Sequence, residues 1–520
     1  MMNREGRATT PVEGERPATL HTHSGHRALV QEEPLIFEIG RPGKIGVDLP
    51  ELRGTQSRMG SAARRGKIGL PDLSEPEVVR HYVRLSQKNF SIDTGMFPLG
   101  SCTMKHNPRL NEKVARMPGF ADIHPLQPQE TVPGAFEVMD ELARWLKVLT
   151  GMPAVAMSPK AGAHGELCGL MAIKAAIEAR GEKRTRILVP ESAHGTNPAT
   201  AALIGFTVDS IPATARGRVD LVAMKAKLGP DVAAVMVTNP NTCGLFEDEV
   251  RGIADAIHEV GGYFYCDGAN YNAIVGRVRP GDLGVDAMHI NLHKTFSTPH
   301  GGGGPGAGPV VFSQALAPFV PLPYVVSEAG GHRLVEHADE DPAAKPFGRM
   351  VAFHGQMGMF TRALTYMLSH GADGLRQVAD DAVLNANYLL ASLKDVYNAP
   401  FAASGPCMHE ALFDDTAFEG VTTLDIAKAL IDEGFHPMTV YFPLVVHGAM
   451  LVEPTETESK ETLDVFIASM RGLAADARAG KVARFKGAPF LAPRARLDET
   501  AAARKPVLRW EPPKRAEAAE

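Results

Sequence analysis

The 520-residue chain lacks the marks of several protein classes. Its five cysteines are scattered and form no CxxC pair, which argues against a disulfide framework and a zinc site and fits a reducing compartment. We therefore predict no bound metal. No apolar run approaches the roughly 18 residues that a membrane span needs. The net charge of −6 gives no reason to expect nucleic acid or an anionic membrane as a partner.

The N-terminal residues also lack a targeting pattern. They contain arginine but no apolar core of a signal peptide. Three glutamates, Glu5, Glu13 and Glu15, count against an organelle transit peptide. We expect a polar lead and a cytoplasmic protein.

The amino-acid composition and the length of the chain are those of a globular protein with more than one domain. Hydrophobic residues make up 44% and charged residues 22% of the chain, and 520 residues suffice for two or three domains. One helix is predicted near Glu75 to Gln87. We predict an N-terminal wrapping segment at 1–130, a large domain at 131–355, a small α+β domain at 356–490 and an extended tail at 491–520.

Between residues 131 and 310, short β-rich runs alternate with helical stretches. This alternation predicts an α/β domain with a mainly parallel sheet and helices on both faces. Ligands of such sheets bind at the carboxyl ends of the strands. After residue 355 a long helix over 374–397 is followed by strand, helix, strand and a helix that ends near Arg478. The strands of the large domain are predicted at 186–190, 206–212, 233–240, 263–270 and 287–294.

Two strand ends of the large domain carry residues that could contact a cofactor, small residues at one end and a histidine at the other. AGAHGE at 161–166 opens a helix, and small residues there let backbone N–H groups approach a phosphate. Glycine in such a turn also has purely steric uses. His194 follows the strand at 186–190, where it is either a structural histidine or a flat ring that stacks on an aromatic cofactor.

Two further strand ends carry charge. Asp267 ends an apolar strand and is either a turn residue or a buried carboxylate that a protonated pyridine nitrogen would compensate. Lys294 ends the next strand and is either a solvated turn lysine or the amine that forms a Schiff base with an aldehyde cofactor. Together with the phosphate loop and His194, they match what pyridoxal phosphate demands. A P-loop is excluded, because Lys294 precedes the glycines instead of following them.

Six longer motifs then identify a family. The chain resembles the glycine decarboxylase, or P-protein, of the glycine cleavage system, a family of fold type I pyridoxal-phosphate enzymes. Many members are one chain of about twice this length, and this chain resembles the lysine-bearing C-terminal half, called subunit 2 or beta, encoded separately. The motifs are FPLGSCTMKHNP (97–108), AGAHGE (161–166), SAHGTNPA (192–199), CDGANYNA (266–273), NLHKTFSTPHGGGGPG (291–306) and MLVEPTETES (450–459).

The resemblance implies an activity and partners. The activity is pyridoxal-phosphate-dependent decarboxylation of glycine, with transfer of the aminomethyl group to the lipoyl arm of the H-protein. The partners are glycine, the lipoylated H-protein and P-protein subunit 1 (alpha), in a heterotetramer of two alpha and two beta subunits. No nucleic acid or membrane is expected.

The resemblance also implies roles for individual residues. Lys294 would hold the cofactor and Asp267 its ring nitrogen, while His194 would stack on the ring. Lys294 and either His194 or His293 would carry protons. Other cofactor contacts are expected at Gly162, Ala163, Ala269 and Asn270, and the substrate side at Ser101, Cys102, Thr103, His300 and Gly301.

Two alternatives stay open on the sequence. Another fold type I enzyme, such as an amino-acid decarboxylase or an aldolase, would share the cofactor residues, and activity on glycine that depends on a lipoyl protein would separate the two. A non-catalytic scaffold subunit is the second alternative. Lys294 counts against it, because a degenerate half would be expected to lose the lysine first.

Overall fold

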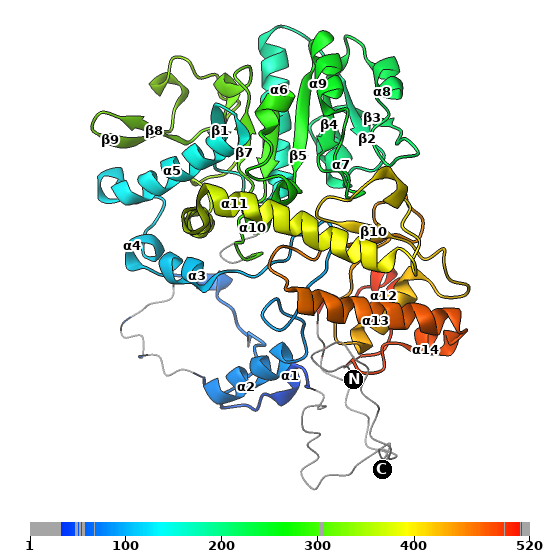
Figure 1. Cartoon of the computed structure of the whole chain (residues 1–520). Helices are drawn as coiled ribbons and strands as arrows, with labels where there is room; N and C mark the ends of the chain where they lie inside the picture. Colours follow the sequence, from blue (N-terminus) through cyan, green and yellow to red (C-terminus); the bar gives the residue numbers. More distant parts are fainter. Residues whose placement is uncertain are drawn as a thin grey trace.

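A seven-stranded sheet forms the centre of the larger part of the molecule (Figure 1). In the computed structural model the described residues are 33–46, 50, 54, 58–66, 68–301, 306–492, 494–509 and 511. The strand order is β1-β7-β6-β5-β4-β2-β3, and β7 alone runs antiparallel to its neighbours in this sheet. The strands are β1 (Ala154–Ala156), β2 (Arg186–Pro190), β3 (Thr207–Ile211), β4 (Val232–Thr238), β5 (Tyr263–Gly268), β6 (Ala287–Ile290) and β7 (Val310–Phe312).

Helices cover both faces of this sheet, as predicted. Alternate residues of β4 show why: Val235 and Val237 pack into one hydrophobic cluster, whereas Ala234 and Met236 pack into another. The first cluster draws on α5 (Pro133–Thr150), α8 (Leu221–Lys227), α9 (Val250–Glu259) and α11 (Met357–Leu393). The second draws on α6 (Gly162–Ala179) and α7 (Thr196–Leu203). The predicted α/β class with a mainly parallel sheet is confirmed.

The predicted strand through Lys294 was wrong at its end. β6 stops at Ile290, and Lys294 lies in the single helical turn α10 (Leu292–Thr295). Ile290 N–H still donates to the Pro309 carbonyl at 2.8 Å, so the chain pairs with the segment entering β7 up to this point. The amides of Lys294 and Thr295 then turn back to the Asn291 carbonyl, at 3.0 and 3.2 Å. This turn aims Lys294 away from the sheet.

The long helix α11 crosses the molecule between the seven-stranded sheet and a smaller C-terminal unit (Figure 1). It bends at Gly371, whose φ is 64°, and the predicted helix at 374–397 overlaps only its second half. The smaller unit holds a sheet in the order β10-β12-β11 and its own hydrophobic cluster. Its elements are β10 (Ala411–Phe413), α12 (Thr423–Asp432), β11 (Thr439–Val440), β12 (Met450–Val452), α13 (Lys460–Arg478) and α14 (Val482–Gly487).

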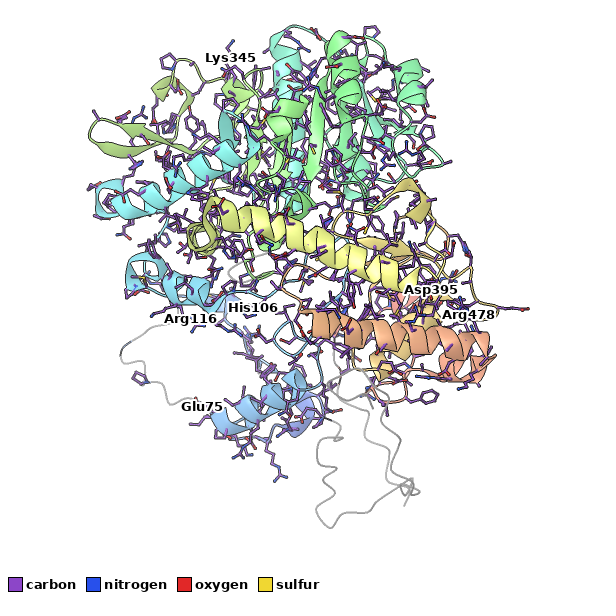
Figure 2. The ribbon with its side chains drawn as sticks, viewed as in Figure 1. Glu75, His106, Arg116, Lys345, Asp395 and Arg478 are labelled. Atoms are coloured by element: carbon purple, nitrogen blue, oxygen red, sulfur yellow. The ribbon has the colours of Figure 1, made fainter. Side chains whose placement is uncertain are left out.

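The small unit closes against the end of α11. Asp395 and Arg478 lie at the same end of this unit (Figure 2), and Arg478 donates a 2.7 Å hydrogen bond to the Val396 carbonyl. The predicted order of elements up to Arg478 agrees with the structure, which adds the short strand β11. The proposed domain boundaries at 130, 355 and 490 stay predictions.

The N-terminal part contains more helix than predicted. The helix expected at 75–87 is α2 (Glu75–Ser86), which begins at a capping box between Ser74 and Glu77.

Among the described residues, none of the helices has both the length and the apolarity needed to cross a bilayer. The remaining elements are α1 (Ile36–Ile39), α3 (Arg109–Ala115), α4 (Pro118–Ala121), the hairpin β8 (Tyr324–Glu328) with β9 (Gly331–Val335), and α15 (Glu499–Arg504).

Candidate active site

A cavity of about 210 Å³ lies at the carboxyl ends of β4, β5 and β6. This is where an open parallel sheet binds its ligands. Thr103 and Gly301, predicted on the substrate side, are not among its lining residues: Thr103 is buried and Gly301 is exposed. The predicted residues that the structure brings together here are Ser101, Cys102, Gly162, Ala163, His194, Asp267, Ala269, Asn270, His293, Lys294 and His300.

Other lining residues were missed from the sequence. Glu166 closes the AGAHGE motif, but a single glutamate in a helix carries no signal of its own. His289 lies in β6 two residues before Asn291, and the pleat of the strand was the only clue that both share a face. The missed residues are Glu166, Thr196, Thr238, Thr242, His289 and Asn291.

Lys294 reaches the cavity from α10. Its Nζ donates a 3.0 Å hydrogen bond to the Ser101 carbonyl, and the side chain is partly buried. Ser101 belongs to a turn that comes from the N-terminal part of the chain, nearly 200 residues away in sequence. The amine is therefore held by one neutral acceptor, which leaves its remaining hydrogen-bonding positions open toward the cavity.

Asp267 is a buried carboxylate at the end of β5. Its Oδ2 accepts from Asn197 Nδ2 at 3.0 Å and its Oδ1 accepts from the Ala269 amide at 2.9 Å. His289 Nε2 lies 3.4 Å from Oδ1. Burial acts to raise the pKa of Asp267, but His289 and these hydrogen bonds outweigh it and lower the pKa below its ordinary value. The group stays anionic and can pair with a cationic ring nitrogen.

A second layer orients this carboxylate. Burial raises the pKa of Tyr265 well above its ordinary value, so its hydroxyl keeps the proton, and this hydroxyl lies 2.7 Å from His289 Nδ1. Burial also lowers the pKa of His289, which favours the neutral ring. Because Nε2 faces the Asp267 carboxylate, the proton of the neutral ring is assigned to Nε2, which leaves Nδ1 to accept from Tyr265.

Glu166 connects Asp267 to the loop that carries His194. The Asn197 amide bridges the two carboxyls, 3.0 Å from an oxygen of each, and Thr196 donates to Glu166 at 2.7 Å. Burial, and then the charge of Asp267, raise the pKa of Glu166 to about 7. His194 Nδ1 forms a 2.8 Å hydrogen bond with Thr196 Oγ1, which fixes the His194 ring at the rim of the cavity.

The N-terminus of α6 forms an anion cradle in the same cavity. Ala161, its N-cap, has no side chain that could bond the first helical N–H groups, which therefore stay available. A Cβ at Gly162 would lie 2.6 Å from Asn291 Oδ1, so a side chain there would have to displace the Asn291 amide. Among the described residues, Asn291 Oδ1 and Thr238 Oγ1 are buried without a hydrogen-bond partner. Both residues line the cavity, where a polar ligand could supply the missing hydrogen bonds.

Two histidines close the other side. The rings of His293 and His300 meet edge to face with centroids 4.9 Å apart. Burial, followed by His300 and Lys294, lowers the pKa of His293 to about 3. His293 is thus a neutral ring beside the lysine, and its Nδ1 accepts a 3.4 Å hydrogen bond from the Ala307 amide. The site as a whole could hold an aldehyde cofactor with an anionic group, with a lysine for the aldehyde and a carboxylate for a ring cation.

Comparison with known proteins decides the family. The chain is 68% identical over 516 residues to the probable glycine dehydrogenase (decarboxylating) subunit 2 of Caulobacter vibrioides, covering 98% of both chains. It is 49% identical over 489 residues to the protein of the same name from Desulforamulus reducens, covering 92% of this chain and 99% of the relative. The chain belongs to the glycine dehydrogenase (decarboxylating) subunit 2 family. The resemblance predicted from the six motifs is confirmed.

Family models agree with this membership of the glycine dehydrogenase family. The model described as "Glycine dehydrogenase, C-terminal domain" matches residues 378–487, which cover the end of α11 and most of the small unit. The model described as "Aminotransferase class-V" matches residues 165–316, a stretch that contains both Asp267 and Lys294. The chain is therefore an enzyme of a pyridoxal-phosphate-dependent class.

Solved structures show the same fold. A glycine decarboxylase (P-protein) of the glycine cleavage system, in inhibitor-bound form, aligns with a TM-score of 0.65 at 22% identity, covering 88% of this chain and 100% of that one. Glutamate decarboxylase of Lactobacillus brevis aligns with a TM-score of 0.60 at 14% identity, covering 83% and 96%. The predicted fold type I architecture is confirmed, while the roles of single residues stay predictions.

Proposed function

We propose that this chain is the lysine-bearing subunit of a glycine decarboxylase. With pyridoxal phosphate in the cavity, it removes the carboxyl group of glycine and transfers the aminomethyl group to the lipoyl arm of an H-protein. The observation that carries the proposal is the convergence of Lys294, Asp267 and the N-terminus of α6 on one cavity, in a family named for decarboxylating glycine. Nothing in the site favours another function.

The residues present fit the cofactor. Pyridoxal phosphate, when bound, supplies the electron sink that makes loss of CO2 from an amino acid possible. The first turn of α6 would meet the phosphate, together with Thr238 and Asn291, whose buried oxygens lack partners among the described residues. Asp267 is the anion for the ring nitrogen, and Lys294 is the amine for the aldehyde.

Each of these side chains is prepared for its part by the protein. Asn197, Ala269 and His289 hold the Asp267 carboxylate charged and in one orientation. Lys294 binds the Ser101 carbonyl, which offers no negative charge to neutralise the amine. Neutral His293 lies beside Lys294, and His194 borders the space for the ring.

The substrate side of the cavity also suits a small substrate. Glycine has no side chain to bind, so discrimination must come from exclusion of larger amino acids. Cys102 and His300, whose Sγ and Nδ1 lie 3.9 Å apart, narrow the substrate side.

The chain also needs partners. A family named subunit 2 implies a further subunit, and we assign this role to P-protein subunit 1 in a cytoplasmic heterotetramer of two alpha and two beta subunits. His194 and His300 are exposed in this chain, so the cavity opens toward the side where a partner subunit or a lipoyl arm can approach.

Release of labelled CO2 from carboxyl-labelled glycine tests the proposal. The assay contains lipoylated H-protein, with and without subunit 1, and compares the wild type with Lys294→Ala. Lys345→Ala is the control, because Lys345 is exposed and is not among the residues that line the cavity; Figure 2 labels it at the edge of the molecule. We expect release with the partner present, loss in Lys294→Ala and no change in Lys345→Ala. No release from cofactor-loaded wild type, with the partner present, would point to a different substrate.

A further inference from the structure

Three buried titratable residues that the proposed function leaves unused lie behind the substrate side of the cavity. His409, Glu410 and Glu453 are fully buried, and one ligand atom of each lies within 4.8 Å of the others. Glu410 directly precedes β10 and Glu453 directly follows β12, so the small unit supplies the whole group. Among the described residues neither acid forms a salt bridge with lysine or arginine, although Lys294 is close enough to lower the pKa of both. Buried acids without such a bridge are costly, which calls for a reason.

Both carboxyls hold one turn of the N-terminal part, the turn 101–103. The Ser101 amide donates to Glu410 Oε1, and the Thr103 hydroxyl donates to Glu453 Oε1 at 2.5 Å. Ser101 has a φ of 61°, a left-handed conformation that a non-glycine residue adopts only when its surroundings impose it. A Cβ at Gly100 would lie 2.5 Å from the Leu451 carbonyl oxygen, so the turn lies directly against β12.

The same turn reaches the reactive lysine. The Ser101 carbonyl accepts the hydrogen bond from Lys294 Nζ at 3.0 Å. Glu410 therefore binds the N–H of Ser101, and the carbonyl of the same Ser101 binds Lys294. Two residues after the turn, Lys105 donates to the Thr295 carbonyl at 2.8 Å, so this segment binds α10 at a second point.

The chemistry of the pair favours one shared proton. Burial, followed by the charge of Glu410, raises the pKa of Glu453 well above its ordinary value, and burial raises the pKa of Glu410 to about 7. Two carboxylates this close cannot both ionise in the protein interior. Burial lowers the pKa of His409 to about 3, so its ring is neutral and adds no compensating charge. The proton is assigned to Glu453, which leaves Glu410 as the anionic acceptor of the Ser101 amide.

We propose that Glu410 and Glu453, sharing one proton, are positioning residues for Lys294. They fix the turn 101–103 in its left-handed conformation, and the Ser101 carbonyl then directs Lys294 Nζ into the cavity. The inference rests on the proposed function only in taking Lys294 as the cofactor-binding lysine. The small unit would in this way set the geometry of a group that belongs to the large unit.

The test compares four full-length variants with the wild type. Glu410→Ala and Glu453→Ala remove the acceptors. Glu453→Gln keeps an uncharged acceptor for Thr103 and a donor toward Glu410, as a protonated carboxyl does. Thr103→Val removes one contact without touching the small unit, which keeps the test valid if an alanine variant fails to fold. The control is Asp425→Asn, because Asp425 is a buried carboxylate of the same unit that binds Lys486 and Arg496 instead of the turn.

Two readouts need neither glycine nor H-protein. The first is hydrogen exchange of the peptide containing the Ser101 amide in the cofactor-loaded protein. The second is the rate at which the visible absorbance of lysine-bound cofactor develops when pyridoxal phosphate is added to stripped protein. We expect both alanine variants and Thr103→Val to exchange faster and to attach cofactor about tenfold or more slowly, because small misplacements of a reacting group cost large rate factors.

The conservative variant decides between positioning and mere stability. Glu453→Gln should recover most of what Glu453→Ala loses, while Asp425→Asn should lose thermal stability yet attach cofactor at the wild-type rate. Folded alanine variants with wild-type exchange and attachment would overturn the inference, as would a Glu453→Gln variant as impaired as Glu453→Ala. A stoichiometric divalent metal bound through these residues would also overturn it. Failure of glycine decarboxylation alone would count against the proposed function and leave this test intact.

Discussion

Asp267 shows how single residues prepare this site. The carboxylate is buried, yet His289, Asn197 and the Ala269 amide lower its pKa and keep it charged. These three neighbours also set its geometry. The negative charge is left for a ligand to neutralise, which is what a protonated ring nitrogen does.

Asp267→Asn keeps the shape of the side chain and removes its charge. We expect glycine decarboxylation to fall by about 10²-fold or more, since a preorganised charge at a reacting group contributes on that scale. Cofactor affinity, measured by fluorescence titration, should fall as well. Asp282→Asn is the control, because Asp282 is exposed and its carboxylate pairs with Arg279 within the same turn. Wild-type activity in Asp267→Asn would contradict the assigned role.

His258 offers a pH test away from the cavity. Its Nε2 lies 2.7 Å from Asp286 Oδ2, and this hydrogen bond raises the pKa of His258 above its ordinary value. A raised pKa in the folded state adds stability that is complete below the unfolded pKa of about 6.5 and is lost as pH rises through the folded pKa.

His258→Ala should therefore cost more at low pH than at high pH. Because the His258 side chain is 40% exposed, we expect a loss of up to about 1 kcal/mol in the free energy of unfolding near pH 6 and a smaller loss near pH 9. Urea unfolding of both proteins at the two pH values measures the difference. A cost that stays constant or grows with pH would show that the ion pair does not form.

At the scale of elements, α6 lies close enough to the sheet to require glycine. A Cβ at Gly169 would lie 2.4 Å from Tyr265 Cε2, within the buried face between α6 and β5. Gly169→Ala should therefore lower the free energy of unfolding by about 1–3 kcal/mol through overpacking, and it should disturb the Tyr265–His289 contact. Thermal and urea unfolding give the size of the effect.

The matched control is the same substitution on an open helix face. Gly472 in α13 is exposed, and a Cβ there would meet nothing within 4 Å. Gly472→Ala should raise the free energy of unfolding by up to about 1 kcal/mol, because alanine favours the helix. Equal effects of the two substitutions would mean that helix propensity, and not the approach of α6 to the sheet, decides both.

The sequence predicted elements well where the pattern was local. Strands β2 to β6 and helix α2 follow from apolar runs, turn residues and a capping box. The turn α10 was missed because Ile290 and Leu292 continue the alternating apolar pattern of a strand. The strand ends because the amides of Lys294 and Thr295 bond the Asn291 carbonyl, which the sequence pattern does not reveal. The first half of α11 was missed because the bend at Gly371 interrupts the helical pattern.

The site could be predicted where a residue lies at, or just after, the end of a predicted strand. This is the case for Lys294, Asp267 and His194. Glu410 and Glu453 could not be found this way, because they contact Ser101 and Thr103 across more than 300 residues of sequence. Only the docking of the small unit brings them there. Periodicity and strand order within one domain carry no information on such a contact.

At the scale of the whole molecule, three stretches of the chain surround Lys294. The turn 101–103 comes from the N-terminal part, the lysine from the large sheet and the carboxyl pair from the small unit, which lies beyond α11 in Figure 1. The chain itself brings the lysine, the buried carboxylate and the N-terminus of α6 to one cavity. We therefore expect the chain to bind cofactor without its partner, even where turnover of glycine requires the partner.

The most direct test is to trap the cofactor on its lysine. The isolated chain is loaded with pyridoxal phosphate, reduced with borohydride, digested and mapped by mass spectrometry, next to Lys294→Ala. We predict one stoichiometric phosphopyridoxyl label on the peptide that contains Lys294, and none at that peptide in the variant. A label confined to another lysine, or no label on wild-type protein, would contradict the account.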